Sequence, residues 1–320
     1  MDPSPRHSLL STADLLLAGG WLLWLGARLP ELWWPLEVLG NFPVQLTLGG
    51  AVLVALFAAL RDLPRLGLSV GLVAAAGWPL LSWQDSARPA PTSGSEPLVL
   101  SLHNVLRTNP TPGRLIDELE HWQPDLAVLQ EVSPAWSASL SRLDPHWPTS
   151  VLQPADHNFG IAAYARQPWQ SAEVLYWCSP PADELPALDL RLTHAGRPLR
   201  VLAVHVFPPV SAAAAAFRRE QVDGVVRELR AHPELPTVVI GDLNTTMFAH
   251  TYRDLRARTG LRDARSGWGL LTSWPAVLPS WARLSLDHVL VSEELRVTDL
   301  QLGEPTGSDH RGLRVALQWR

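Results

Sequence analysis

The stretch Val238–Met247, "VVIGDLNTTM", ends an apolar run on a carboxylate and a carboxamide. The Val-Val-Ile run is typical of a buried β-strand. Asp242 and Asn244 are two residues apart, so on an extended strand their side chains would point to the same face. An Asx-type turn that closes the strand is the alternative interpretation of the same residues.

Other apolar runs in the C-terminal two thirds of the chain also carry polar side chains at or near their ends. A buried carboxylate is unfavourable unless it is paired, hydrogen-bonded or bound to a metal. Any one of these residues alone would most simply be a cap or a hydrogen-bonded core group. As a set they predict a common cleft at the strand ends. They are Asn104 in "LVLSLHNV", Glu131 in "DLAVLQEV", His205 in "RVLAVHV", Asp287 and His288 in "LSLDHVLV", and Ser308, Asp309 and His310 in "TGSDHRGL".

The region 98–320 alternates short apolar runs with polar segments and a few amphipathic stretches. Many strands with helices between them predict an α+β fold of stacked sheets with helices outside. The helix at 211–231 has the clearest signal, because a Ser stands at its start and its tail is amphipathic. Strands are expected near 98–103, 126–130, 160–165, 172–177, 187–193, 199–206, 237–241, 286–291 and 313–319, and helices at 112–122, 133–142, 211–231 and 249–258.

The first 85 residues are apolar and contain few charges. Three stretches come close to the roughly 20 residues needed to cross a hydrocarbon core, and Trp residues stand at their ends, as in an interfacial belt. We therefore expect about three transmembrane helices; a buried helical hairpin of a soluble protein is the alternative. A cleavable signal peptide fits less well, because two more apolar stretches follow the first. The stretches are 15–29, 44–60 and 66–83.

The charges around these stretches predict an orientation. Arg6 precedes the first stretch, and Arg61 and Arg65 lie between the second and third. The positive-inside rule places these segments in the cytoplasm, so that three crossings deliver the rest of the chain to the outer side. The expected organisation is a transmembrane region at 1–85, a Pro/Ser/Gly-rich linker at 86–97 and a catalytic domain at 98–320.

The composition sets limits on partners. The formal net charge is −5 and the single cysteine, Cys178, excludes an internal disulfide. Residues 96–320 contain 25 acidic residues against 21 arginines, which gives no support for nucleic-acid binding by charge. The Trp-rich segment Ser273–His288 is unusually apolar for a loop. It would pack on the sandwich, touch a bilayer or form part of a substrate cleft.

The motifs "HNV", "LQEV", "VHV", "GDLN", "LDHVLVS" and "GSDH", with the Gly-led "FGIAAYAR", occur in one order along the chain. This ordered series resembles the endonuclease/exonuclease/phosphatase superfamily over about residues 97–320. The apolar N-terminus resembles a membrane-attached bacterial branch of it. The resemblance implies a four-layer αββα sandwich that hydrolyses phosphate esters with Mg²⁺, for which Mn²⁺ could substitute.

The resemblance also implies roles for the metal-side residues. Glu131 matches the metal-binding carboxylate, and one firm carboxylate is enough for Mg²⁺, which keeps several waters. Asn104 matches the amide that supports the metal or a phosphate oxygen; a turn residue is its alternative interpretation. Asp309 matches a position near the metal.

Five further residues match catalytic positions of the family. Asp242 would align or deprotonate the attacking water, and Asn244 would hold a phosphate oxygen. His310 would contact the scissile phosphate or transfer a proton, with Asp287 orienting it and raising its pKa. His205 would donate a hydrogen bond to a nonbridging phosphate oxygen.

The expected protein is a membrane-anchored, Mg²⁺-dependent phosphoesterase that cleaves a diester of nucleic-acid or phospholipid-headgroup type by in-line attack of water. Its expected location is the bacterial inner membrane, with the catalytic domain on the periplasmic side and no obligate protein partner. His288, Tyr164 and Tyr176 receive no catalytic role. Two alternatives are a noncatalytic module that binds a phosphorylated ligand and a membrane scaffold protein.

Overall fold

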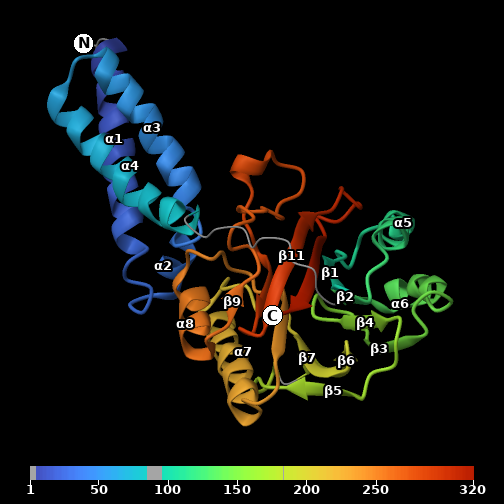
Figure 1. Ribbon diagram of the computed structural model, residues 1–320. Coiled ribbons are helices and arrows are strands. Elements are labelled where there is room, and N and C mark those ends of the chain that lie inside the picture. The colour runs from blue at the N-terminus through green and yellow to red at the C-terminus, as the bar shows by residue number, and fades with distance from the viewer. Residues whose placement is uncertain (1–4, 85–95, 183) are drawn as a thin grey trace. The chain divides into compact units, whose positions relative to one another are not determined.

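The computed structural model describes residues 5–84, 96–182 and 184–320, and these form two compact units (Figure 1). Of the described residues, one unit comprises 5–84 with Met247–His250, and the other comprises those from 96 to Thr246 with Thr251–Arg320. The predicted linker at 86–97 lies, as far as residue 95, outside the described residues.

The N-terminal unit is helical, and a helix forms at each of the three predicted apolar stretches. Helices α3 and α4 approach closely at Gly50, where a Cβ would lie 2.9 Å from Val73 Cγ2. A small apolar core contains Leu17, Leu53, Phe57 and Leu72. The helices are α1 (Pro5–Gly26), α2 (Trp34–Leu39), α3 (Pro43–Ala59) and α4 (Leu63–Gln84).

One helix of the described chain is long and apolar enough to cross a membrane: the segment Leu63–Leu81 of α4. The apolar segments of the other two, Leu10–Gly26 and Pro43–Ala59, are shorter. The prediction of three helical stretches is confirmed, whereas their assignment as a transmembrane bundle stays a prediction.

The C-terminal unit is built on two six-stranded sheets with the orders β11-β12-β1-β2-β4-β3 and β5-β6-β7-β8-β10-β9. Each sheet is mixed, because β1 and β2 pair in parallel in the first and β7 and β8 in the second. The strands are β1 (Leu98–Asn104), β2 (Leu126–Gln130), β3 (Thr149–Gln153), β4 (Ile161–Ala165), β5 (Ser171–Tyr176), β6 (Pro186–His194), β7 (Arg197–Ala203), β8 (Thr237–Asp242), β9 (Arg262–Asp263), β10 (Asp287–Val291), β11 (Leu295–Leu302) and β12 (Leu313–Trp319).

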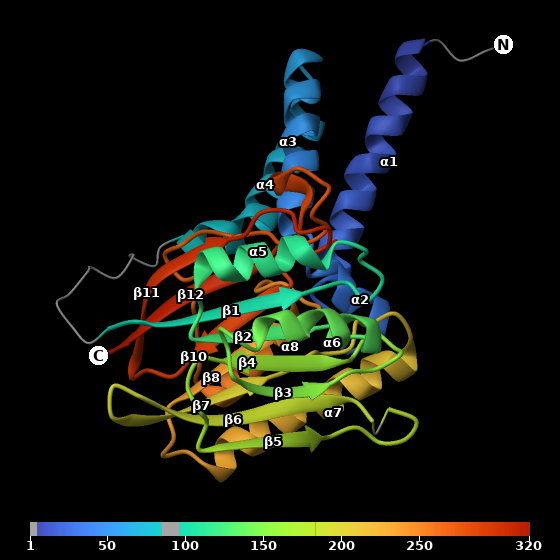
Figure 2. The same cartoon turned by 90° about the vertical axis from the view of Figure 1, so that its right-hand side faces the viewer.

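The two sheets pack face to face on one apolar core, with helices on their outer sides (Figures 1 and 2). That core joins Leu100 and Val128 of the first sheet to Val201 and Ile240 of the second. Helices α5 (Pro112–Trp122) and α6 (Pro134–Leu140) cover the first sheet through a separate cluster that includes Leu119. Helices α7 (Ala212–Ala231) and α8 (His250–Thr259) accompany the second. The predicted α+β sandwich of two packed sheets between helices is confirmed.

Nine of the strands coincide with predicted ones within a few residues, and three were missed. The missed strands lack the apolar runs used to find the others. β3 (Thr149–Gln153) is partly exposed along its length, β9 (Arg262–Asp263) has two polar residues, and β11 (Leu295–Leu302) interleaves Arg, Thr, Asp and Gln with its apolar residues.

The close approach of Gly160 to the backbone of Val132 gives a test of packing. A Cβ at this glycine would lie 2.0 Å from the carbonyl oxygen of Val132, whereas one at Gly113, in α5, would meet nothing within 4 Å. Gly160→Ala should lower the free energy of unfolding by about 3 kcal/mol, because backbone must move to relieve the clash. Gly113→Ala should leave it unchanged or raise it slightly. Urea unfolding of the full chain in detergent measures both; equal stability of the two variants would contradict the packing.

Candidate active site

The strand directions bring the predicted polar residues to one end of the sandwich. β1 and β2 run parallel and deliver Asn104 and Glu131 at their C-terminal ends. β7 and β8 do the same in the other sheet and deliver His205 and Asp242. β10 runs antiparallel to β8, so that its first residue, Asp287, pairs in register with Asp242. The site is therefore divided between the two sheets.

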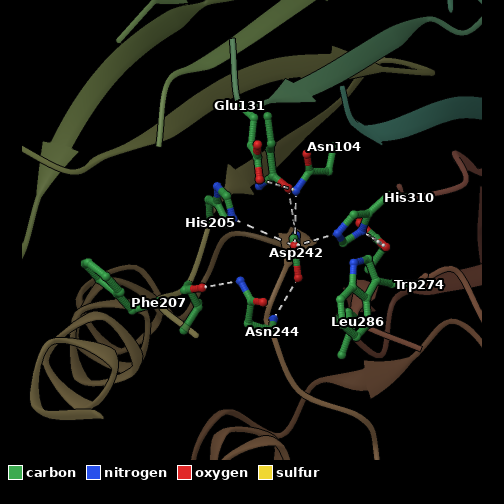
Figure 3. Close-up of polar contacts among 12 residues, drawn as sticks. Asn104, Glu131, His205, Phe207, Asp242, Asn244, Trp274, Leu286 and His310 are labelled. Carbon is green, nitrogen blue, oxygen red and sulfur yellow. Dashed lines mark hydrogen bonds and ion pairs between the residues drawn. The ribbon is translucent and has the colours of Figure 1, made fainter. Parts of the chain in front are cut away.

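Asn104 connects the two halves of the site (Figure 3). Its side-chain Nδ2 donates to Glu131 Oε1 at 3.1 Å and to Asp242 Oδ2 at 3.3 Å. The backbone N–H of Arg107 donates to the other oxygen, Oε2, of Glu131 at 3.2 Å. Glu131 is nearly buried and has a positive φ of 62°, so the chain turns sharply after β2 to present this carboxylate.

Gln130, which sequence reasoning missed, fixes the distance between the sheets. Its Nε2 donates to the carbonyl oxygen of Val204 at 2.6 Å, and its Oε1 accepts from the backbone N–H of Asp242 at 2.9 Å. The side chain is fully buried. The available signal was a long amide at the end of the otherwise apolar run "LAVLQ", because a buried amide needs partners.

Asp242 and Asn244 are related by a turn, and the expectation that both lie on an extended strand was wrong. β8 ends at Asp242, and Asn244 has a φ of 49°. Asp242 Oδ1 accepts from the Asn244 backbone N–H at 2.8 Å, which is the Asx-type turn of the alternative interpretation. The Asn244 side chain still faces the site, and its Nδ2 donates to the carbonyl oxygen of Val206 at 2.9 Å (Figure 3).

His310 lies between two buried carboxylates. Its Nδ1 is 2.8 Å from Asp287 Oδ2, and its Nε2 is 3.6 Å from Asp242 Oδ2. Burial lowers the pKa of His310, but the charges of Asp287 and Asp242 outweigh burial and raise that pKa to about 10. Burial also raises the pKa of Asp242, to about 7, against the opposing charge of His310. His310 is therefore an imidazolium at neutral pH.

Asp287 stays ionised in spite of complete burial. Burial raises its pKa, yet the charge and hydrogen bond of His310 outweigh burial and leave the pKa below its usual value. Behind it, Arg265 donates to the Asp287 carbonyl oxygen and lies 3.1 Å from His288 Nδ1. Arg265 and His288 are both fully buried, so His288 belongs to the support of Asp287 rather than to the pocket.

His205 lies beside Asp242 at the same end of the second sheet, with 3.7 Å between its Nε2 and Asp242 Oδ2. Burial lowers the pKa of His205 to about 3, and the neighbouring charge of His310 acts in the same direction. A neutral imidazole can donate one hydrogen bond without adding a charge to the site.

Asp309 and its neighbours attach the segment before β12 to the site. One oxygen of Asp309 accepts from Trp274 Nε1 at 3.0 Å, and the other is buried without a hydrogen bond from the described residues. Ser308 Oγ donates to the Asn104 carbonyl oxygen at 2.7 Å and accepts from the His310 backbone N–H at 3.0 Å. These contacts place Asp309 and His310 on the same end of the sandwich as Asn104.

The donor set of this pocket suits a hard divalent cation. The carboxylates of Glu131 and Asp242 converge on the Asn104 amide nitrogen, and carboxylate oxygens are ligands that Mg²⁺ prefers. The Asn104 Oδ1 accepts from the backbone N–H of Leu106 at 3.1 Å, so the carboxylates supply the free oxygen ligands here. Ligand atoms of Asp242, Asp287 and His310 also lie within 4.8 Å of one another. In that second cluster the Nδ1 of His310 already pairs with Asp287 Oδ2 at 2.8 Å, so one imidazole nitrogen and one carboxylate oxygen are occupied. The side of the pocket near Asn104 and Glu131 therefore fits the cation better.

Solved structures with the same fold come from animals and bacteria. Humanized TDP2 of D. rerio is 18% identical, with a TM-score of 0.57, over 70% of this chain and 100% of its own. The human Nocturnin catalytic domain with bound sulfate is 18% identical, with a TM-score of 0.54, over 73% of this chain and 96% of its own. An endonuclease/exonuclease/phosphatase from Beutenbergia cavernae is 18% identical, with a TM-score of 0.57, over 70% and 72% of the two chains. No curated protein matches the chain.

A family model described as "Endonuclease/Exonuclease/phosphatase family" matches residues 102–310. The match begins two residues before Asn104 and ends at His310, so it includes every residue of the site, and it covers more than half of the chain. The chain belongs to the endonuclease/exonuclease/phosphatase family of phosphoester hydrolases.

Proposed function

We propose that the protein is a Mg²⁺-dependent phosphodiesterase that cleaves a diester of nucleic-acid or phospholipid-headgroup type. The observation that carries the proposal is the buried ion pair of His310 and Asp287 beside Asp242, Asn104 and Glu131. The arrangement combines an acid-lined place for a cation with a fixed positive charge for the phosphate.

The bound cation would be held by the Glu131 carboxylate and supported by the Asn104 amide, and it would neutralise charge on the phosphate and the leaving oxygen. Asp242 lies between this place and His310, and its carboxylate is positioned to orient a water and to take its proton.

Three side chains would stabilise the transition state from the other side. His310 brings a positive charge that Asp287 orients through Nδ1, so that Nε2 is left for a phosphate oxygen or the leaving group. His205 brings a neutral donor. Asn244 has one further amide hydrogen beyond its bond to Val206. Asp309 would act near the cation, through the oxygen that does not bond Trp274.

The membrane part of the proposal rests on sequence and on α4. Its segment Leu63–Leu81 has the length and composition of a membrane span, and two other apolar helices precede it. The arginines at positions 6, 61 and 65 favour a cytoplasmic N-terminus and a periplasmic catalytic domain in the bacterial inner membrane.

Removal of the metal carboxylate should abolish most activity. Glu131→Ala and the isosteric Glu131→Gln are expected to slow hydrolysis of bis(4-nitrophenyl) phosphate on the order of 10³-fold, because the cation supplies several kcal/mol of charge stabilisation. Calorimetric titration with Mg²⁺ should show weaker binding by both variants. Glu173→Gln, an exposed glutamate on β5, is the matched control and should behave as wild type. Wild-type rates in the Glu131 variants would contradict the assignment.

Asp287→Asn should shift the pH profile as well as lower the rate. Wild-type His310 holds its proton below pH about 10 and loses it as the pH rises. Without the Asp287 charge its pKa falls, so the alkaline loss of kcat/KM should begin at lower pH, with a rate reduced about 10²-fold or more at neutral pH. The exposed Asp144→Asn is the control. An unshifted alkaline limb would exclude His310 as the group that Asp287 tunes.

Mg²⁺ binding near pH 7 should release protons. A cation beside Asp242 favours its ionised form, so a carboxyl whose pKa is about 7 must lose its proton as the metal enters. Titration calorimetry in buffers with different ionisation enthalpies counts these protons. Glu118→Gln removes another carboxyl with a pKa raised by burial to about 7 and should leave the release intact. Undiminished proton release in Asp242→Asn would refute the assignment.

A further inference from the structure

The loop between Trp274 and Leu284 exposes apolar side chains beside the site. Val277 is 87% exposed, Trp281 62% and Leu278 40%. From Ser266 to Leu286 the chain contains no acidic residue and one basic residue, Arg283. Exposed apolar side chains that gather on one short segment are a feature of contact surfaces.

The loop is held in shape by its own hydrogen bonds. Trp274 and Leu284 form an antiparallel bridge at its base. The Leu278 backbone N–H donates to the Pro275 carbonyl oxygen at 3.0 Å, and Thr272 Oγ1 donates to the Ser280 carbonyl oxygen at 2.9 Å. The backbone that carries the exposed side chains is therefore ordered by hydrogen bonds within the loop.

The base of the loop is part of the site's wall. Trp274 bonds Asp309 through its indole N–H, its ring centroid lies 6.4 Å from that of His310, and it stands beside His310 in Figure 3. The backbone N–H of Ala276 donates to the Asp309 carbonyl oxygen at 2.7 Å. Val277 is the next residue, so the exposed part of the loop begins one residue from a contact with Asp309.

We propose that the loop 275–283 inserts into the surface of a lipid bilayer and that the site cleaves the phosphate ester of a lipid headgroup. The inference rests on the proposed phosphodiesterase function and narrows it to one substrate class. Aliphatic side chains with a Trp and an Arg are the combination that partitions into the headgroup region of a bilayer.

The charge of the loop argues against nucleic acid at this surface. Nucleic-acid affinity comes mainly from several cations that neutralise phosphates and from aromatic side chains on which bases stack. The loop offers one arginine and one exposed aromatic side chain, Trp281, whereas Val277 and Leu278, its other large exposed hydrophobic residues, cannot stack on bases.

If α4 spans a membrane, the chain length limits how far the site can lie from the bilayer. Thirteen residues separate the end of α4 at Gln84 from the start of β1 at Leu98. A fully extended segment of this length reaches at most about 45 Å. If α4 spans the membrane, this connection confines the sandwich to a layer next to the lipid surface.

The first test locates the loop in the full chain reconstituted into nanodiscs of equimolar phosphatidylcholine and phosphatidylglycerol. In a Cys178→Ala background, Val277→Cys carries a polarity-sensitive fluorophore, and Tyr176→Cys, at a residue 51% exposed at the end of β5, is the matched control. The label at position 277 should shift to shorter wavelength and be quenched by spin-labelled lipid, and the label at 176 should not. Equal, aqueous behaviour of both labels would overturn the proposal.

The second test separates the loop from the chemistry. The double variant Val277→Asp/Trp281→Ser should hydrolyse a chromogenic headgroup phospholipid in the nanodisc at least about tenfold more slowly, because it loses apolar contact with the bilayer. Its rate with soluble bis(4-nitrophenyl) phosphate should stay within about twofold of wild type. Val277→Leu/Trp281→Phe should retain both activities.

The remaining outcomes are equally decisive. Three results would overturn the lipid assignment but leave the protein a phosphodiesterase. The double variant loses both activities, or it hydrolyses the lipid at an unchanged rate. In the third, the wild-type protein cleaves a single-stranded oligonucleotide faster than the phospholipid. A wild-type protein inactive on every substrate with Mg²⁺ would instead refute the proposed function and with it this inference.

Discussion

The burial of two carboxylates side by side is the constraint on which the rest of the site depends. Asp242 and Asp287 are paired in register at the ends of β8 and β10, and both are 1% exposed. Two negative charges in such a place would repel each other and force one group to bind a proton. The imidazolium of His310 lies between them and compensates the charge, so the last motif of the chain completes the strand ends of the second sheet.

The neighbouring contacts all maintain that arrangement. Arg265 and His288 support the backbone and the far side of Asp287, and Ser308 ties the His310 segment to Asn104. The amide of Asn104 then reaches the carboxylates of both sheets. The result is a pocket with a cationic side and an anionic side, and a phosphate with its metal needs one of each.

Strand periodicity and the ordered motifs predicted part of this site from the sequence. The strand ends that deliver Asn104, Glu131 and Asp242 follow apolar runs, and the structure brings them together. Gln130 could not be assigned from local sequence, because its partners, Val204 and Asp242, lie far along the chain and become neighbours only when the sheets pack. The turn at Asn244 escaped the strand argument because side-chain alternation holds only while φ stays extended, and β8 ends two residues earlier.

The side-chain amide of Gln130 fixes the spacing between the two sheets at the pocket, and so the distances between the site residues that they carry. Its two ends hold backbone atoms of the opposite sheet, while the adjacent residue, Glu131, turns out into the pocket. Any slippage of one sheet over the other would separate Glu131 from Asp242 before a single strand is lost. Heat or pressure that shifts one sheet relative to the other would thus abolish activity while the circular dichroism spectrum stays native. The alignment of the two sheets is lost before the strands within each sheet unfold.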